Sequence, residues 1–328
     1  MISQKRIIWI DWMKTLAMYL IIAGHSNVPG NKYIYVFSVP CFFIISGFLT
    51  KVEDKQVFWR KLWWNLVVPM IIIVSINLMY NIVLHYIRGT FDISMLWQGP
   101  LLSLIGMQGN DYNNLGLGAM WFVYTLILCK IILQHIPNSN KNVWLLFINL
   151  VFILTTILIH KKGLIILNSY TNVLLSMPFF SIGYALRPHK ENFSNLQVKY
   201  IICIIIASVL CLLFCGRNNN IVMLYRCDYG SNILLCVSGA LAGTSLVYAV
   251  SLLLQSFICK TVSTIAGGTL IILGFHFQII LLLSHIIPTK GLLLYVESFF
   301  LLIAFIPIIK FTQRYFPIVY GKLRIEKI

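Results

Sequence analysis

The stretch Ile7-Ile8-Trp9-Ile10-Asp11-Trp12-Met13-Lys14-Thr15-Leu16-Ala17-Met18-Tyr19-Leu20-Ile21-Ile22-Ala23-Gly24-His25 is long and apolar enough to cross a bilayer as one helix. Three of its side chains ionise, although a charge within a span costs about 2.5–3.5 kcal/mol on insertion scales. On a helix that advances about 100° per residue, Lys14 and His25 lie within roughly 20° of each other, and Asp11 lies roughly 60° from Lys14. The three residues therefore share one face, which indicates a polar site or pathway and not a plain membrane anchor.

The remainder of the chain is also strongly apolar. Hydrophobic residues make up 59% of the 328 residues and charged residues only 10%. This balance excludes an ordinary soluble domain and predicts an all-α, polytopic membrane bundle with a single domain over residues 1–328. With about 20 residues needed per span, we expect about ten transmembrane helices, at 7–27, 33–50, 64–86, 117–136, 143–160, 164–186, 199–215, 232–254, 263–284 and 290–311.

The positions of the basic residues predict the orientation in the membrane. If the spans alternate, most of the 25 Lys and Arg residues fall on the same side as the N-terminus. Because cytoplasmic loops are enriched in Lys and Arg, both termini are expected in the cytoplasm, in a multi-pass protein of the cytoplasmic (inner) membrane. The net charge of +16 then reflects topology. The charges form no single basic face, so we expect the lipid bilayer and no nucleic acid as a partner.

His25 is the first candidate for chemistry, because an imidazole titrates near neutral pH and can take a proton from a hydroxyl group. Lys14 could bind a negatively charged group, such as a phosphate, that enters from the cytoplasm. Asp11 would then neutralise or orient Lys14. Two plainer interpretations stay open: His25 as a satisfied histidine at the membrane boundary, and an Asp11–Lys14 pair that only lowers the cost of insertion.

Two later spans also contain ionisable residues, His276 and Glu297, and both are candidates for polar roles in the same cavity. An isolated carboxyl group such as that of Glu297 should be neutral or paired, with Lys14, His25 and His276 as possible partners. No spacing of Cys and His indicates a metal site, and no tightly bound cofactor is expected. Cys215 and Cys227 flank an outer loop, where two free thiols are favoured over a disulfide.

Two polar segments on the outer side are candidates for the entrance of a substrate. One runs from about 87 to 116 and contains the polar run Gln108–Asn114. The other is Gly216–Gly230. Long loops without a regular pattern are often functional, although both segments could equally be solvated connections.

Several segments resemble the membrane acyltransferase-3 family, and together they extend over nearly the whole chain. Ile10–Lys14 followed by Gly24-His25-Ser26 is similar to the family's first helix, which carries an Asp, then an Arg, ten further residues and a His. The next span is similar to the family's "vPlFFfiSGy" helix. The resembling segments after the first helix are Phe37–Phe48, Met120–Val123, Pro178–Tyr184 and Gly267–His276.

The resemblance implies an enzyme that moves an acyl group, usually acetyl, from cytoplasmic acetyl-CoA or another acyl-CoA to a hydroxyl group. The acceptor would be a surface or exported glycan, or a lipid-linked sugar. His25 would be the catalytic histidine, with Asp11 supporting it and Lys14 in the donor-facing basic position. Ser46 and Trp121, within the resembling segments, are expected to contribute polar groups to the cavity.

The chain departs from the family pattern at two positions that bear on the donor. Lys14 stands where the family usually has an arginine, which removes the planar fork that binds phosphate in two places. Asn65, four residues before Pro69, stands where a second arginine is usual. Donor binding is therefore expected to depend also on Arg60 and Lys61.

A different class of protein remains an alternative, namely a proton-coupled carrier or exporter of a glycan precursor. In that case the ionisable residues of the spans would form a proton relay. These residues are Asp11, Lys14, His25, His276 and Glu297.

Overall fold

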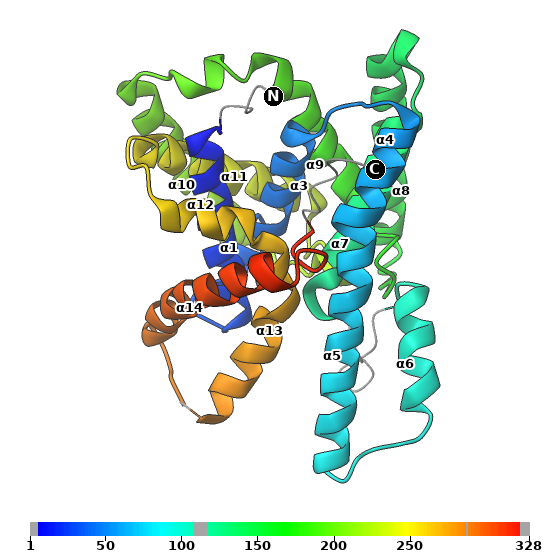
Figure 1. The fold of residues 1–328 in the computed structure, drawn as a ribbon. Coiled ribbons are helices and arrows are strands. Elements are labelled where there is room, and N and C mark those ends of the chain that lie inside the picture. The colour runs from blue at the N-terminus through cyan, green and yellow to red at the C-terminus, as the bar shows by residue number, and fades with distance from the viewer. Residues whose placement is uncertain (1–5, 108–116, 287, 322–328) are drawn as a thin grey trace.

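The computed structural model describes residues 6–107, 117–286 and 288–321, and this part of the chain is predominantly helical (Figure 1). It contains two isolated β-bridges, Met107–Asn168 and Met223–Asp228, and no strand. The predicted all-α polytopic bundle is thereby confirmed. The polar run Gln108–Asn114 lies outside the described residues.

The helices follow one another with short connections. Their bounds are α1 (Ile8–His25), α2 (Asn31–Tyr35), α3 (Ser38–Leu49), α4 (Lys55–Leu62), α5 (Val68–Ile87), α6 (Met95–Leu104), α7 (Trp121–His135), α8 (Lys141–Lys161), α9 (Val173–Leu186), α10 (Val198–Asn218), α11 (Ile233–Leu254), α12 (Lys260–Gly267), α13 (Thr269–Ile286) and α14 (Leu293–Tyr315). A π-helical turn, Trp63–Val67, joins α4 to α5, and a 3₁₀ turn, Gly118–Met120, precedes α7.

Eight helical segments of the described chain are long and apolar enough to cross a membrane. They are the α2–α3 segment, the continuous α4–α5 segment, α7, α8, α10, α11, α13 and α14. Of the other two expected spans, α1 carries Asp11 and Lys14, and α9 has only 14 residues. The span expected from residue 164 starts as a helix only at Val173, because Asn168 and Ser169 bond to the chain at residues 105–106. The count of ten spans and the cytoplasmic termini stay predictions.

The α4–α5 segment is the longest helix of the bundle, with 33 residues from Lys55 to Ile87. At 1.5 Å per residue it measures about 50 Å, whereas the hydrocarbon layer is about 30 Å thick. Figure 1 shows it beside α6 at one edge of the molecule. Its basic first part, which holds Arg60 and Lys61, therefore has room to extend beyond the membrane.

Helix α1 is enclosed by other helices. It contacts α2, α3, α11, α12, α13 and α14, and Figure 1 shows it in the interior of that group. Two hydrogen bonds fasten it to the segment before and within α12: Trp12 Nε1 donates to the carbonyl oxygen of Phe257 (3.0 Å), and Thr15 Oγ1 donates to that of Val262 (3.3 Å). The surrounding helices keep the ionisable side chains of α1 away from lipid, where they would be costly.

Helices α3 and α9 cross with their backbones in contact at two glycines. A Cβ atom at Gly47 would overlap the carbonyl oxygen of Phe180, and one at Gly183 would overlap that of Ile44. Small residues allow this kind of close approach between helices in membranes. Both glycines lie in segments that resemble the family, and the crossing explains why those segments need a residue without a side chain.

Replacement of Gly47 by alanine should therefore destabilise the bundle. The added methyl group would push α9 away from α3, and overpacking of this kind costs about 1–3 kcal/mol or more. We expect Gly47→Ala and Gly183→Ala each to lower the midpoint of thermal unfolding in detergent. Gly24→Ala is the matched control, because its Cβ would make only an ordinary contact of 3.5 Å with Ile34. Equal midpoints for all three variants would refute the role of the crossing.

The orientation in the membrane can be tested at Cys259, which lies just before α12. This thiol is exposed, and hydrogen bonds with Val262 and Thr261 hold its pKa below the usual value, which favours the reactive thiolate. If both termini are cytoplasmic and the spans alternate, the loop between α11 and α12 that contains Cys259 lies inside the cell. We therefore expect a membrane-impermeant maleimide to label Cys259 only after permeabilisation, and Cys259→Ser to abolish that labelling. Labelling of Cys259 in intact cells would reverse the proposed orientation.

Candidate active site

A cavity of about 240 Å³ lies between α1, α3, α7 and α13. Two lysines, Lys14 of α1 and Lys130 of α7, are the charged residues of its lining, to which no Asp or Glu of the described ranges belongs. We call it the lysine cavity. Its lining also includes Met18, Ile21, His25, Val39, Phe42, Ile45, Ser46, Leu49, Leu66, Ala119, Trp121, Phe122, Val123, Leu126, Thr269, Leu270 and Leu273.

A second cavity, of about 550 Å³, lies between α1, α2, α7 and the loop that follows α10. Residues 221–225 of that loop form one wall, so we call it the loop cavity. It is more polar than the lysine cavity in the kinds of side chain that it presents. These are Asn27, Asn31, Tyr35, Ser38, Trp121 and Tyr225, besides His25 and several apolar residues.

The loop that borders this cavity is held in place by Asn219. The side-chain Oδ1 of Asn219 accepts hydrogen bonds from Ser231 Oγ (3.0 Å) and from the backbone N–H of Asn232 (2.9 Å). Its Nδ2 donates to the carbonyl oxygen of Tyr229 (3.2 Å). The sequence predicted Gly216–Gly230 as one side of a substrate entrance. The structure places part of that segment against a cavity, although Gly216 itself is still within α10.

His25 lines both cavities. Its ring lies at the end of α1, and the residues shared by the two linings are Ile21, His25, Val39, Ala119 and Trp121. The rings of Tyr35 and Phe277 lie 5.8 Å from the His25 ring between centroids, and both contact it edge-on. Within the described residues, neither ring nitrogen of His25 makes a hydrogen bond. An imidazole thus lies where the two cavities meet.

Lys130 is a residue of the site that the sequence analysis does not identify. In the structure it lines the lysine cavity together with Lys14. Its Nζ donates to Thr50 Oγ1 (2.8 Å), which in turn donates to the carbonyl oxygen of Ser46 (2.7 Å). Its spacing in the sequence is a signal for this position. Lys130 follows Val123 by seven residues and Leu126 by four, so helical periodicity places it on the same face of α7 as these two cavity residues.

Arg60 and Lys61, which the sequence predicted to bind the donor, lie on α4 and are exposed. Neither lines the lysine cavity. Lys61 Nζ forms an ion pair of 2.5 Å with Glu53, and Gln134 of α7 donates to the backbone of Glu53 (2.7 Å). Gln134 lies one turn beyond Lys130 on α7, so these residues are on the same side of the bundle as the lysine cavity.

Asp11 is buried and lies outside the linings of both cavities. Its carboxylate accepts hydrogen bonds from Arg6 Nε and from Ser263 Oγ (3.4 Å), and Arg6 also donates to the carbonyl oxygen of Ser263 (2.6 Å). Asp11 thus ties the start of α1 to α12. Its predicted support of Lys14 or His25 stays a prediction.

The two other ionisable candidates have different surroundings. His276 is fully buried on α13, and its ring centroid lies 5.2 Å from that of His25. Glu297 is partly buried on α14 and lines neither cavity, and its Oε2 is buried without a hydrogen bond within the described chain. The adjacent Ser298 donates to Ser26 Oγ (3.2 Å), directly after His25.

The cysteines are free thiols throughout the described part. Cys227 donates to Asn172 Oδ1 (3.3 Å), and burial raises the pKa of its thiol to about 11. Cys215 lies beside Cys211, with 3.9 Å between the sulfur atoms. Cys215 and Cys227 are thus not joined to each other in the structure, and their free thiols in the cell stay a prediction. No cluster of three or more His, Cys, Asp or Glu suited to a metal occurs in the described ranges.

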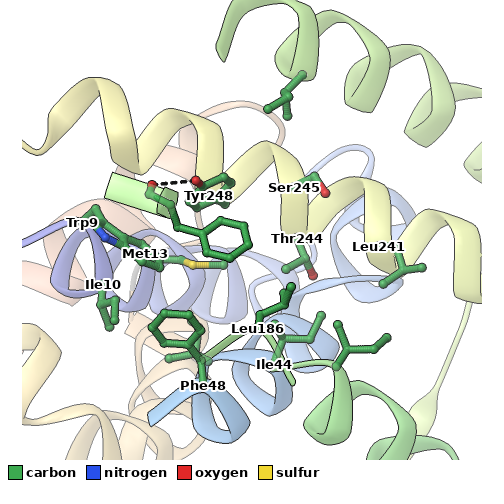
Figure 2. Close-up of a pocket in the computed structure, with 14 residues that line it drawn as sticks. Trp9, Ile10, Met13, Ile44, Phe48, Leu186, Leu241, Thr244, Ser245 and Tyr248 are labelled. Atoms are coloured by element: carbon green, nitrogen blue, oxygen red, sulfur yellow. Dashed lines mark hydrogen bonds between the residues drawn. The ribbon is translucent and has the colours of Figure 1, made fainter. Parts of the chain in front are cut away.

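A third pocket, of about 260 Å³, lies between α1, α3, α9, α10 and α11 (Figure 2). Its labelled side chains are almost all apolar, among them Trp9, Met13 and Phe48. The hydroxyl group of Tyr248 donates to the carbonyl oxygen of Phe193 (2.7 Å). Because its described lining offers no histidine, carboxylate or cation, this pocket has no group there that is suited to acid–base chemistry.

An all-helical membrane bundle with a histidine between two cavities is suited to join two substrates inside a membrane. Comparison with known families gives the class: residues 7–311 match the model of an acyltransferase domain. No curated protein and no solved structure gives a significant match. The chain belongs to the membrane acyltransferase-3 family and is a multi-pass membrane acyltransferase.

Proposed function

We propose that the protein is an O-acyltransferase of the cytoplasmic membrane. It transfers an acyl group, specifically acetyl, from cytoplasmic acyl-CoA to a hydroxyl group of a surface or exported glycan. The observation that carries the proposal is the position of His25, which belongs to the linings of both cavities. A donor in one cavity and an acceptor in the other would both be within reach of the same imidazole.

The lysine cavity suits the acyl end of an anionic donor. Lys14 and Lys130 give it positive charge without a lining carboxylate, and its other walls are mainly apolar. At about 240 Å³ it is smaller than the ~300–1,000 Å³ typical of sites that enclose a drug-sized ligand. The nucleotide end of acyl-CoA therefore stays outside. Arg60 and Lys61, exposed on the same side, are suited to attract its phosphates.

The loop cavity suits a carbohydrate. Amide and hydroxyl side chains there can exchange hydrogen bonds with sugar hydroxyl groups, and the tyrosine and tryptophan rings can pack against the apolar faces of a sugar. Among the described residues its lining contains, apart from His25, no Lys, Arg, Asp or Glu, which favours a neutral acceptor group. Under the proposed orientation this cavity faces the outer side.

The reaction requires one proton transfer in each direction. His25 takes the proton of the acceptor hydroxyl group as its oxygen attacks the carbonyl carbon of the thioester. The carbon–sulfur bond then breaks, and the departing thiolate receives the proton from His25. The products are the ester and free CoA thiol, and His25 returns to its neutral form.

Replacement of His25 by alanine tests the assignment of the base. Loss of a positioned general base lowers rates by about 10²–10⁴-fold, so we expect His25→Ala to lose acyl transfer at unchanged abundance in the membrane. Activity is measured as CoA thiol released by purified protein given acetyl-CoA and a sugar acceptor. His285→Ala, on an exposed turn of α13, is the matched control. Full activity of His25→Ala contradicts the proposal.

The same assay separates the enzyme from the carrier. A carrier in proteoliposomes would move its substrate across the membrane without consuming the thioester. The carrier is favoured if the wild-type protein moves substrate across the membrane without a thioester and releases no CoA thiol with any acyl-CoA.

Lys14 and Lys130 are expected to act on donor affinity. A hydrogen bond to a charged group contributes about 1.5–3 kcal/mol, so Lys14→Met and Lys130→Met should each raise the KM for acyl-CoA by roughly ten- to a hundred-fold. Lys14→Arg should retain most of the affinity, since the charge and donors remain. Lys61→Met serves as the control, and its smaller effect should disappear at high salt. Unchanged donor KM in both cavity variants would contradict the proposed donor site.

A further inference from the structure

The orientation of the His276 ring fixes which of its nitrogens carries hydrogen. Nδ1 lies 2.9 Å from the carbonyl oxygen of Ile272 and 3.1 Å from that of Leu273, one turn earlier on α13. A carbonyl oxygen can only accept a hydrogen bond, so Nδ1 must be the donor. In a neutral imidazole the other nitrogen, Nε2, is then a bare acceptor.

This acceptor has no partner in the described structure. Nε2 of His276 is buried without a hydrogen bond, and the whole residue has 0% exposure. Leaving a buried polar group without a partner costs about 1–3 kcal/mol, which is why such groups usually have a role or a missing ligand. His276 lines neither cavity, so a substrate in either one would not reach it directly.

The ring of His25 lies beside the ring of His276. The two ring centroids are 5.2 Å apart and the rings are tilted by 50°. Because the nitrogens lie on the perimeters of the rings, a centroid separation of this size allows a hydrogen bond once a nitrogen of each ring faces the other, which a rotation of the His25 side chain can bring about. The other rings around His25, Tyr35 and Phe277, contact it edge-on.

We propose that His276 is a positioning residue whose Nε2 accepts a hydrogen bond from one ring N–H of His25. That bond holds His25 in a single tautomer and leaves its second nitrogen as a bare acceptor directed at the two cavities. His276 itself does not touch the substrates. The inference deepens the proposed function and rests on it, because it assigns the second histidine to the preparation of the same base.

The arrangement gives His25 what a catalytic base needs. A base must present a lone pair, and a partner that binds the opposite nitrogen determines which lone pair is free. The same logic applies to a carboxylate behind a catalytic histidine. Here the partner is the neutral imidazole of His276, whose own N–H is bonded to backbone carbonyl oxygens. A neutral partner in place of a carboxylate avoids a buried negative charge within the membrane.

The tautomers can be measured without any substrate, by nitrogen-15 NMR of the full-length protein labelled at histidine in detergent micelles. We expect His276 protonated at Nδ1 only, with the Nε2 signal shifted by an accepted hydrogen bond, and a single tautomer for His25. His276→Leu should convert the His25 signals to a mixture of tautomers. A His276 protonated at Nε2, or His25 signals unaffected by His276→Leu, would overturn the inference.

The kinetic test compares two replacements. His276→Gln keeps an oxygen acceptor near the place of Nε2, whereas His276→Leu has none. We expect His276→Leu to lower kcat about tenfold or more, with unchanged KM for donor and acceptor, and His276→Gln to recover most of that loss. Equal losses in the two variants, or a loss confined to folded yield, would refute a positioning role. Absence of thiol release by the wild type would instead refute the proposed function, while the NMR result would still decide the tautomers.

Discussion

The structure depends on one constraint, namely that the ionisable face of α1 cannot be exposed to hydrocarbon. Six other helices surround α1, and the polar side chains Lys14 and His25 face cavities between these helices. The wall formed by α3 depends in turn on its close crossing with α9, where Gly47 and Gly183 each admit a carbonyl oxygen of the other helix. The glycines of these segments thus position the residues of α3 that face Lys14 and His25.

Much of this could be predicted from local pattern. Lys14 and His25 are eleven positions apart, helical periodicity puts them on one face, and both line the same cavity. Apolar runs likewise predicted the helical bundle. Local pattern could not reveal the hydrogen bond of Asp11 to Ser263, or the approach of His276 to His25, because these join residues far apart in the chain. The apolar pattern also predicted a span from residue 164, whereas α9 begins at Val173. An apolar segment can form a loop when a neighbouring loop offers hydrogen-bond partners, as residues 105–106 do for Asn168 and Ser169.

The departures from the family pattern have a structural counterpart. Asn65, in the π-helical turn, does not line the lysine cavity, and its backbone oxygen lies against Gly321, where a Cβ would approach it to 2.7 Å. The next residue, Leu66, lines the cavity with an apolar side chain. In this chain the second positive charge of the cavity comes instead from Lys130 of α7, which Thr50 links to the backbone of Ser46. Both positive charges of the cavity lining, Lys14 and Lys130, thus come from α1 and α7.

The meeting of two cavities at His25 also has an electrical consequence. Where both cavities are hydrated from opposite sides of the membrane, the insulating layer between them is only as thick as the side chains around the His25 imidazole. Most of the transmembrane voltage then falls across those few side chains. Each elementary charge that crosses such a layer exchanges about 2.3 kcal/mol per 100 mV. The side chains that line both cavities beside His25, namely Ile21, Val39, Ala119 and Trp121, are the ones across which that voltage would fall.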